Sequence, residues 1–94
     1  MVSLVETKNY LRVDGNDEDL LITSLITTAE ELVLGVMRRT KSSFKEIPET
    51  VRQACLFTIA TLYENRQGGK GGLDMANLLD MIRRMTFAYR KEAF

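Results

Sequence analysis

The sequence predicts an all-α fold, a small four-helix domain built around a central apolar helix. Apolar residues recur at helical spacing through residues 17–39, and an almost unbroken apolar run fills residues 54–63. Glycine, proline and asparagine separate these segments from their neighbours. A chain of 94 residues has room for one domain, so we expect residues 1–94 to share a single core.

The first expected helix is short and covers residues 4–11. Ser3 and Glu6 have the spacing of a capping box, in which each side chain satisfies the other residue's free backbone amide. Gly15 and Asn16 accept the positive φ that a turn often needs. We therefore expect the turn over residues 13–16 to end this helix.

The second expected helix, residues 17–39, has the clearest amphipathic pattern. Asn16 is the expected N-cap, and the acids that follow it complement the positive end of the helix dipole, as Arg38 and Arg39 complement the negative end. Leu34 is an apolar residue on the otherwise polar face. The apolar arc, about 160° wide, contains Leu21, Ile22, Leu25, Ile26, Ala29, Leu32, Val33, Val36 and Met37.

The third expected helix begins at Pro48, whose missing amide costs nothing at a first helical position, and ends near Gln67 at Gly68. Between Ala54 and Tyr63 it has no polar face, so it must be covered on most sides. We expect it to be the central core element.

The C-terminal quarter begins with a flexible glycine-rich linker at residues 68–72. A fourth helix is expected over about residues 73–85. Residues from about 86 to 94 either continue this helix or form an extended C-terminal arm.

Charge composition restricts the function. The chain has 13 basic and 13 acidic residues and no histidine, so it lacks the basic excess of proteins that mainly grip phosphate backbones. Residues 1–31 hold seven acidic and two basic side chains, which leaves the remainder basic. Such opposite charges either attract copies of the chain to one another or simply solvate exposed faces. The chain start does not resemble a signal peptide, and we expect no membrane contact.

No residue pattern indicates an enzyme. The segment around Lys70 lacks the strand and the Ser or Thr of a phosphate-binding loop. Cys55 lies within the most apolar segment and has no histidine base in the chain, so we expect it in the core. We expect no catalytic residue, no cofactor and no metal. A magnesium-dependent nuclease subunit, using the acids at residues 17–19, stays an alternative.

A small DNA-binding regulator is the main alternative. The basic residues form two clusters, Arg38, Arg39, Lys41 and Lys45, and Arg83, Arg84, Arg90 and Lys91. However, a helix-turn-helix motif joins its helices by a turn of about 3–4 residues, and the expected connections here are longer. Its recognition helix also needs an exposed polar face, which residues 48–67 lack.

Three stretches, taken in order, resemble a known family. Residues 4–14 form a short helix that runs into a Leu-Arg-aliphatic-Asp turn, residues 17–30 begin with Asp-Glu-Asp-Leu-Leu-Ile, and residues 47–66 run from Ile-Pro to Leu-Tyr-Glu-Asn-Arg. Together they are similar to the small head–tail connectors of tailed bacteriophages, the adaptors that dock beneath the portal. The family's Pro-Tyr-Arg-like ending is echoed at residues 88–90, with Ala88 in place of the proline.

The resemblance implies a structural virion protein, made in the host cytoplasm, that forms a homo-oligomeric ring under the portal protein. Such a ring extends the channel through which double-stranded DNA passes without sequence-specific binding, and it joins the head to a stopper or tail-completion protein. A closed ring uses heterologous contacts, which the uneven charge distribution suits. The candidate interface residues are Leu34, Phe44, Glu64, Asn65, Arg66, Tyr89, Arg90 and Phe94.

Overall fold

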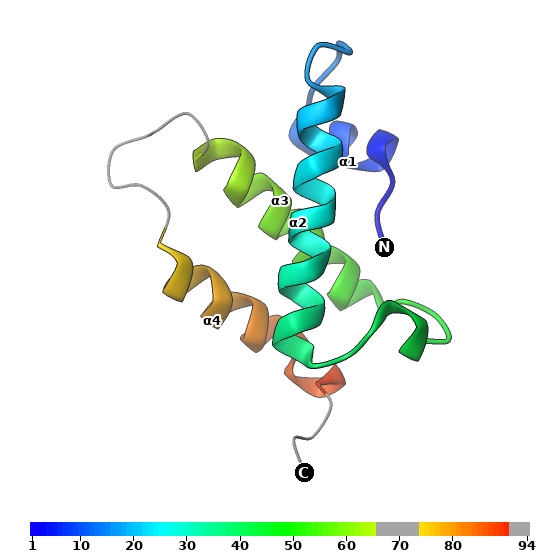
Figure 1. Ribbon diagram of the computed structural model, residues 1–94, viewed down its shortest axis with the longest axis vertical. Coiled ribbons are helices and arrows are strands. Elements are labelled where there is room, and N and C mark those ends of the chain that lie inside the picture. Colours follow the sequence, from blue (N-terminus) through cyan, green and yellow to red (C-terminus); the bar gives the residue numbers. More distant parts are fainter. Residues whose placement is uncertain (66–73, 91–94) are drawn as a thin grey trace.

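The computed structural model describes residues 1–65 and 74–90, and within them every regular element is a helix (Figure 1). The all-α prediction is confirmed. The elements, in chain order, are α1 (Leu4–Leu11), α2 (Asp19–Met37), the 3₁₀ turn η1 (Lys41–Ser43), α3 (Glu49–Asn65), α4 (Met75–Thr86) and the 3₁₀ turn η2 (Phe87–Tyr89).

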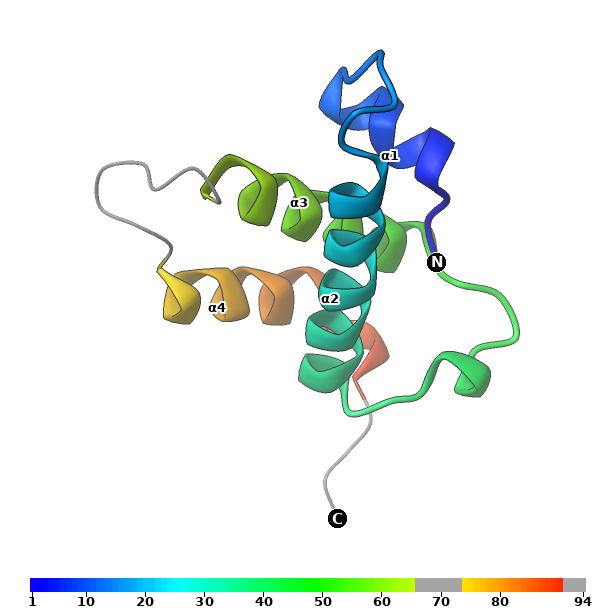
Figure 2. The ribbon, with the colours of Figure 1, turned by 45° about the horizontal axis from the view of Figure 1, so that its top comes forward.

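The core forms where α2, α3 and α4 meet. Figure 2 shows α4 returning alongside α3, with α2 crossing both. The buried side chains of this cluster are Ala29, Val33, Met37, Val51, Cys55, Ile59, Leu78 and Ile82. Because α3 carries more buried residues than any other described helix and contacts each of the other three, it is the central helix that its uniformly apolar sequence predicted.

One face of α3 is less covered than that sequence predicted. Phe57 leaves 43% of its surface exposed, although Leu56 and Thr58 on either side of it are buried. Side chains with polar groups on the buried faces find partners within their own helices: the hydroxyls of Thr58 and Thr86 donate to the carbonyls four residues earlier. The buried hydroxyls of these two threonines therefore have hydrogen-bond acceptors, while the face of α3 that carries Phe57 is exposed to solvent.

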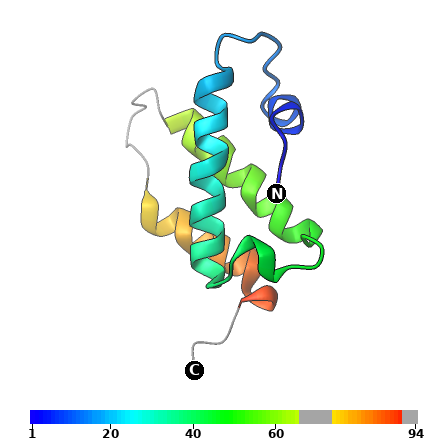
Figure 3. The same cartoon turned by 45° about the vertical axis from the view of Figure 1, so that its right-hand side comes forward.

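Ion pairs attach α1 to α2 and α3; Figure 3 shows α1 beside these two helices. Ser3 Oγ accepts the Glu6 amide at 3.0 Å, which is one half of the predicted capping box. The Glu6 carboxylate, predicted to accept the Ser3 amide, pairs with Arg52 of α3. Lys8 Nζ lies 2.8 Å from Asp19 Oδ1 at the start of α2. The N-terminal amine lies 3.1 Å from Glu30 Oε2. Several acidic residues of the N-terminal third therefore form ion pairs within the fold, in addition to those that are exposed to solvent.

The ends of α1 and α2 share a backbone geometry that was not predicted. It leaves α1 ending at Leu11, as predicted, and ends α2 earlier than predicted. Arg12 and Arg38 adopt left-handed conformations, with φ of 61° and 58°, and amides at and after each of them bond back to the last turn. This Schellman geometry ends a helix. The turn at Gly15 and Asn16 is therefore not what stops α1, and α2 ends at Met37 rather than including Arg38 and Arg39.

The helices α2, α3 and α4 also begin slightly later in the sequence than predicted. Asn16 is not the N-cap of α2, because its side chain accepts Lys8 Nζ at 3.2 Å and the helix begins after Glu18. The prediction that Asn16 caps this helix is wrong. Pro48 precedes α3 and accepts the Arg52 amide. Asp74, which was not predicted as a cap, accepts the Asn77 amide at 3.2 Å to start α4.

The predicted linker, the expected end of the third helix at Gly68, and the last residues of the predicted arm lie outside the described residues. Of that arm, residues 87–89 form η2, and Tyr89 packs at the margin of the core. An extended arm beyond them stays a prediction.

By length and composition alone, α2 could cross a membrane, and 22% of an 18-residue stretch of this helix is buried in the fold. A core helix passes the same test, and α2 packs against the other three helices. Its middle also holds Glu30, which pairs with the N-terminal amine. The low burial reflects its polar face and the half-buried apolar residues that pack against the core, and its exposed large apolar residue is Leu20.

Candidate interaction surfaces

The predicted residues at the end of α3 lie between two grooves. Glu64 is exposed and lines a groove of about 410 Å³ between α3 and α1. Asn65 is half-buried, donates from Nδ2 to the Thr61 carbonyl at 2.7 Å, and lines a groove of about 370 Å³ between α3 and α4. Phe57 borders both grooves. The exposure of Phe57 was not predicted, because a uniformly apolar helix does not reveal which of its sides lacks a neighbouring element.

Phe44 and Tyr89, distant in sequence, meet at Arg39. The Arg39 guanidinium lies 3.8 Å from the centroid of the Phe44 ring. Its Nη1 donates to the Tyr89 carbonyl at 3.2 Å, while Nε and Nη2 donate to Ser43. Both aromatic side chains are half-buried and pack against the core. Phe44, predicted as an interface residue, thus attaches its own loop to the core.

For three other residues, the predicted role in an interface stays a prediction. Leu34 is half-buried on α2 and packs against the margin of the core, which leaves part of its side chain available to a neighbour. Arg66 and Phe94 lie outside the described residues.

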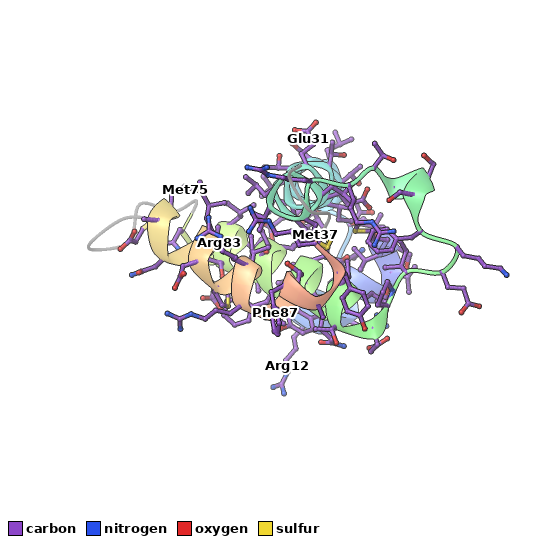
Figure 4. All side chains as sticks on the ribbon, turned by 90° about the horizontal axis from the view of Figure 1, so that it is seen from below. Arg12, Glu31, Met37, Met75, Arg83 and Phe87 are labelled. Carbon is purple, nitrogen blue, oxygen red and sulfur yellow. The ribbon has the colours of Figure 1, made fainter. Side chains whose placement is uncertain are left out.

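A third groove, of about 360 Å³, lies between α2 and α4 and brings the two predicted basic clusters together. Arg38, Arg83 and Arg90, from three different parts of the chain, line it. Its apolar lining comes from Leu32, Val36 and Leu79, and its one carboxylate is Glu31. Figure 4 looks along the molecule from the end where α2 finishes, with Glu31 projecting from α2 and Arg83 on α4. We call this the arginine groove.

Two other members of the first basic cluster form internal contacts. Arg39 holds the Phe44 loop, and Lys41 Nζ lies 3.7 Å from Glu30 Oε1. Within the described residues, this leaves fewer free cations for the phosphate contacts that a DNA-binding regulator needs. The connection between α2 and α3 also contains η1 and is longer than a helix-turn-helix turn.

The chemistry expected at Cys55 is that of a core residue. Its side chain is fully buried, and burial, assisted by the negative charge of Glu30, raises the pKa of its thiol from 9.0 to about 12. A thiol that stays protonated is a poor nucleophile. In residues 1–65 and 74–90, no three His, Cys, Asp or Glu side chains cluster in a way that could hold a metal ion.

Comparison with protein families decides the classification. The family model described as phage gp6-like head-tail connector protein matches residues 1–90. The chain belongs to this family. The connector family is structural rather than enzymatic, and its members are components of the phage particle that interact with portal and tail proteins. The resemblance seen in residues 4–66 therefore extends over nearly the whole chain.

Searches among curated proteins and among solved structures found no significant match. The particular surfaces that this connector uses must therefore be argued from its own residues.

Proposed function

We propose that this connector assembles into a ring beneath the portal, extends the DNA channel, and offers its lower surface to a stopper or tail-completion protein. The family match over residues 1–90 carries the proposal. Two features support it: apolar surface left uncovered at Leu20 and around Phe57, and a charge distribution that is acidic in residues 1–31 and basic in the rest.

Uncovered apolar surface matters because it is costly for a monomer and useful to a subunit. The open groove between α3 and α4 is lined mainly by apolar atoms, with Phe57, Leu78 and Met81 among its residues. Surfaces of this kind mark sites of protein association. We propose that these parts of the surface contact neighbouring subunits or the portal.

The zero formal charge suits a conduit. DNA binding through phosphate contacts scales with the number of cations that a surface presents. A ring of neutral subunits holds the passing duplex weakly, so DNA slides without sequence-specific binding. We propose that the protein is made in the host cytoplasm and resides at the head–tail junction.

Portal binding is the direct test. Purified connector is mixed with the portal ring of the same phage, and the mass of the complex is measured by light scattering after size-exclusion chromatography. We expect a complex whose added mass is a whole multiple of the connector subunit, saturating at a fixed ratio. Albumin in place of the portal is the control. A connector that elutes separately from intact portal rings at all concentrations contradicts the proposal.

A further inference from the structure

The start of α2 carries an exposed apolar residue among acids. Leu20 leaves 89% of its surface exposed, the largest value among the exposed large apolar residues. Its helical phase places it on the polar face of α2, opposite the buried Ile22 and Val33. Asp14 and Asp17, in the preceding loop, are exposed, and within the described residues neither has an ion-pair partner. We call residues 14–20 the acidic tip.

The arginine groove has the complementary character. Its lining combines apolar side chains with three arginines and one carboxylate. Arg83 also lies 3.9 Å from Asp80 Oδ1 in its own helix, whereas Arg38 and Arg90 have no ion-pair partner within the described residues. The groove also has open space beside α2, because an added Cβ at Gly35 meets nothing within 4 Å. Of the other acids in the tip, Glu18 accepts from Tyr63 and Asp19 pairs with Lys8, so Asp14 and Asp17 are the ones that the tip offers to a neighbour. An exposed leucine beside two such carboxylates fits a groove that combines apolar atoms with guanidinium groups.

These two surfaces lie towards opposite ends of the same helix. Figure 1 shows the loop before α2 at one end of the molecule and the end of α2 at the other. With a rise of 1.5 Å per residue, Leu20 and Arg38 are about 27 Å apart along α2. One copy therefore cannot join its own tip to its own groove, but it can offer the tip to one neighbour and the groove to another.

We propose that the acidic tip of one connector docks into the arginine groove of the next copy. Because tip and groove are different surfaces, the contact is heterologous, and repeating it gives a ring when the rotation closes. This proposal rests on the proposed function and specifies which surfaces meet within the ring. It also gives the uneven charge distribution a role, since residues 1–31 supply the tip and residues 32–90 most of the groove.

Disulfide trapping tests the contact, including when association is weak. The variant combines Leu20→Cys with Gly35→Cys, two positions where cysteine fits because the first is exposed and the second faces open space. The native Cys55 is fully buried and does not compete. Under mild oxidation we expect a ladder of cross-linked multimers. Each single variant forms no ladder, because a lone new thiol links at most two chains.

A matched control moves one cysteine away from the tip. Val5→Cys combined with Gly35→Cys also pairs two accessible thiols, because Val5 leaves 70% of its surface exposed on α1. We expect no ladder from it. An equally strong ladder from the control, or no ladder from the test pair at millimolar protein, overturns the proposal.

Charge reversal gives an independent test in the full chain. One variant carries Asp14→Lys and Asp17→Lys, and the other carries Arg38→Glu and Arg90→Glu. All four residues are exposed, so melting curves by circular dichroism should show both variants folded. We expect each variant alone to associate at least about tenfold more weakly than the wild type at low salt.

Mixing the two variants should restore assembly. Each native tip then meets a native groove, and each lysine tip meets a glutamate groove, so every contact in an alternating chain is complementary. Sedimentation velocity reads out the mass. Variants that assemble alone like the wild type, or mixtures that fail to recover, overturn the proposal. Portal binding by the wild type distinguishes this failure from failure of the connector role itself.

Discussion

The contacts of Arg39 make a quantitative prediction. Replacing Arg39 with alanine removes hydrogen bonds to Ser43 and to the Tyr89 carbonyl, together with the contact over the Phe44 ring. The two Ser43 bonds are exposed and contribute about 0.5 kcal/mol each, while the partly buried bond to Tyr89 contributes about 1 kcal/mol. The cation–π contact adds about 0.5 kcal/mol. We expect Arg39→Ala to lose about 2 kcal/mol of unfolding free energy, allowing for non-additivity.

For a domain of this size, 2 kcal/mol corresponds to a fall in Tm of about 10 °C. Thermal and urea denaturation followed by circular dichroism measure it. The matched control is Arg38→Ala, which removes the same charge from the neighbouring position, where the side chain makes no hydrogen bond or ion pair within the described residues. We expect the control to change stability by less than about 0.5 kcal/mol. If both variants are equally stable, Arg39 does not hold the Phe44 loop and the C-terminal turn to the core.

Three further predictions concern other parts of the fold. Arg12→Gly should raise the unfolding free energy by about 1 kcal/mol in urea titrations, because glycine adopts the left-handed conformation without the Cβ penalty; no gain would show that the side chain of Arg12 contributes more than its backbone costs. The buried Cys55 thiol should resist a thiol reagent at pH 8 until the chain unfolds. Burial raises the pKa of this thiol from 9.0 in the unfolded chain to about 12 in the folded protein. The stability that the protonated thiol contributes is therefore complete below pH 9 and is lost as the pH rises towards 12. A Cys55→Ala variant with the same loss of stability above pH 9 would contradict that assignment. Tyr63→Phe should lower stability by about 1 kcal/mol in the same urea titrations, since it removes the 2.6 Å hydrogen bond to Glu18 at the start of α2; an unchanged midpoint would show that this bond contributes nothing net.

Local patterns were sufficient to predict the helices. The amphipathic period of α2 and the apolar run of α3 place both helices and their buried sides, since Ile22, Val33 and Cys55 are all in the core. Helix ends were less predictable. Arginine is not a usual residue for a left-handed C-terminal stop, so nothing at Arg38 indicated where α2 finishes. The end of α1 at Leu11 was predicted, but from the turn at residues 13–16 rather than from the left-handed Arg12.

The surfaces required tertiary information. Arg38, Arg83 and Arg90 fall in two separate sequence clusters and share one groove only because α4 packs beside α2. The role of Arg39 likewise depends on Tyr89, fifty residues away. Leu20 is different, because its helical phase alone places it on the polar face of α2. Leu20 was nevertheless not among the predicted interface residues, which on that face included Leu34 alone.

The connector role is tested most directly in the phage. A mutant with a stop codon early in this gene is grown in a host without a suppressor, and its lysate is inspected by electron microscopy. The account predicts heads and free tails that remain unjoined, with infectious particles restored when the purified wild-type protein is added to the lysate. Normal yields of tailed, infectious particles without the protein would contradict it.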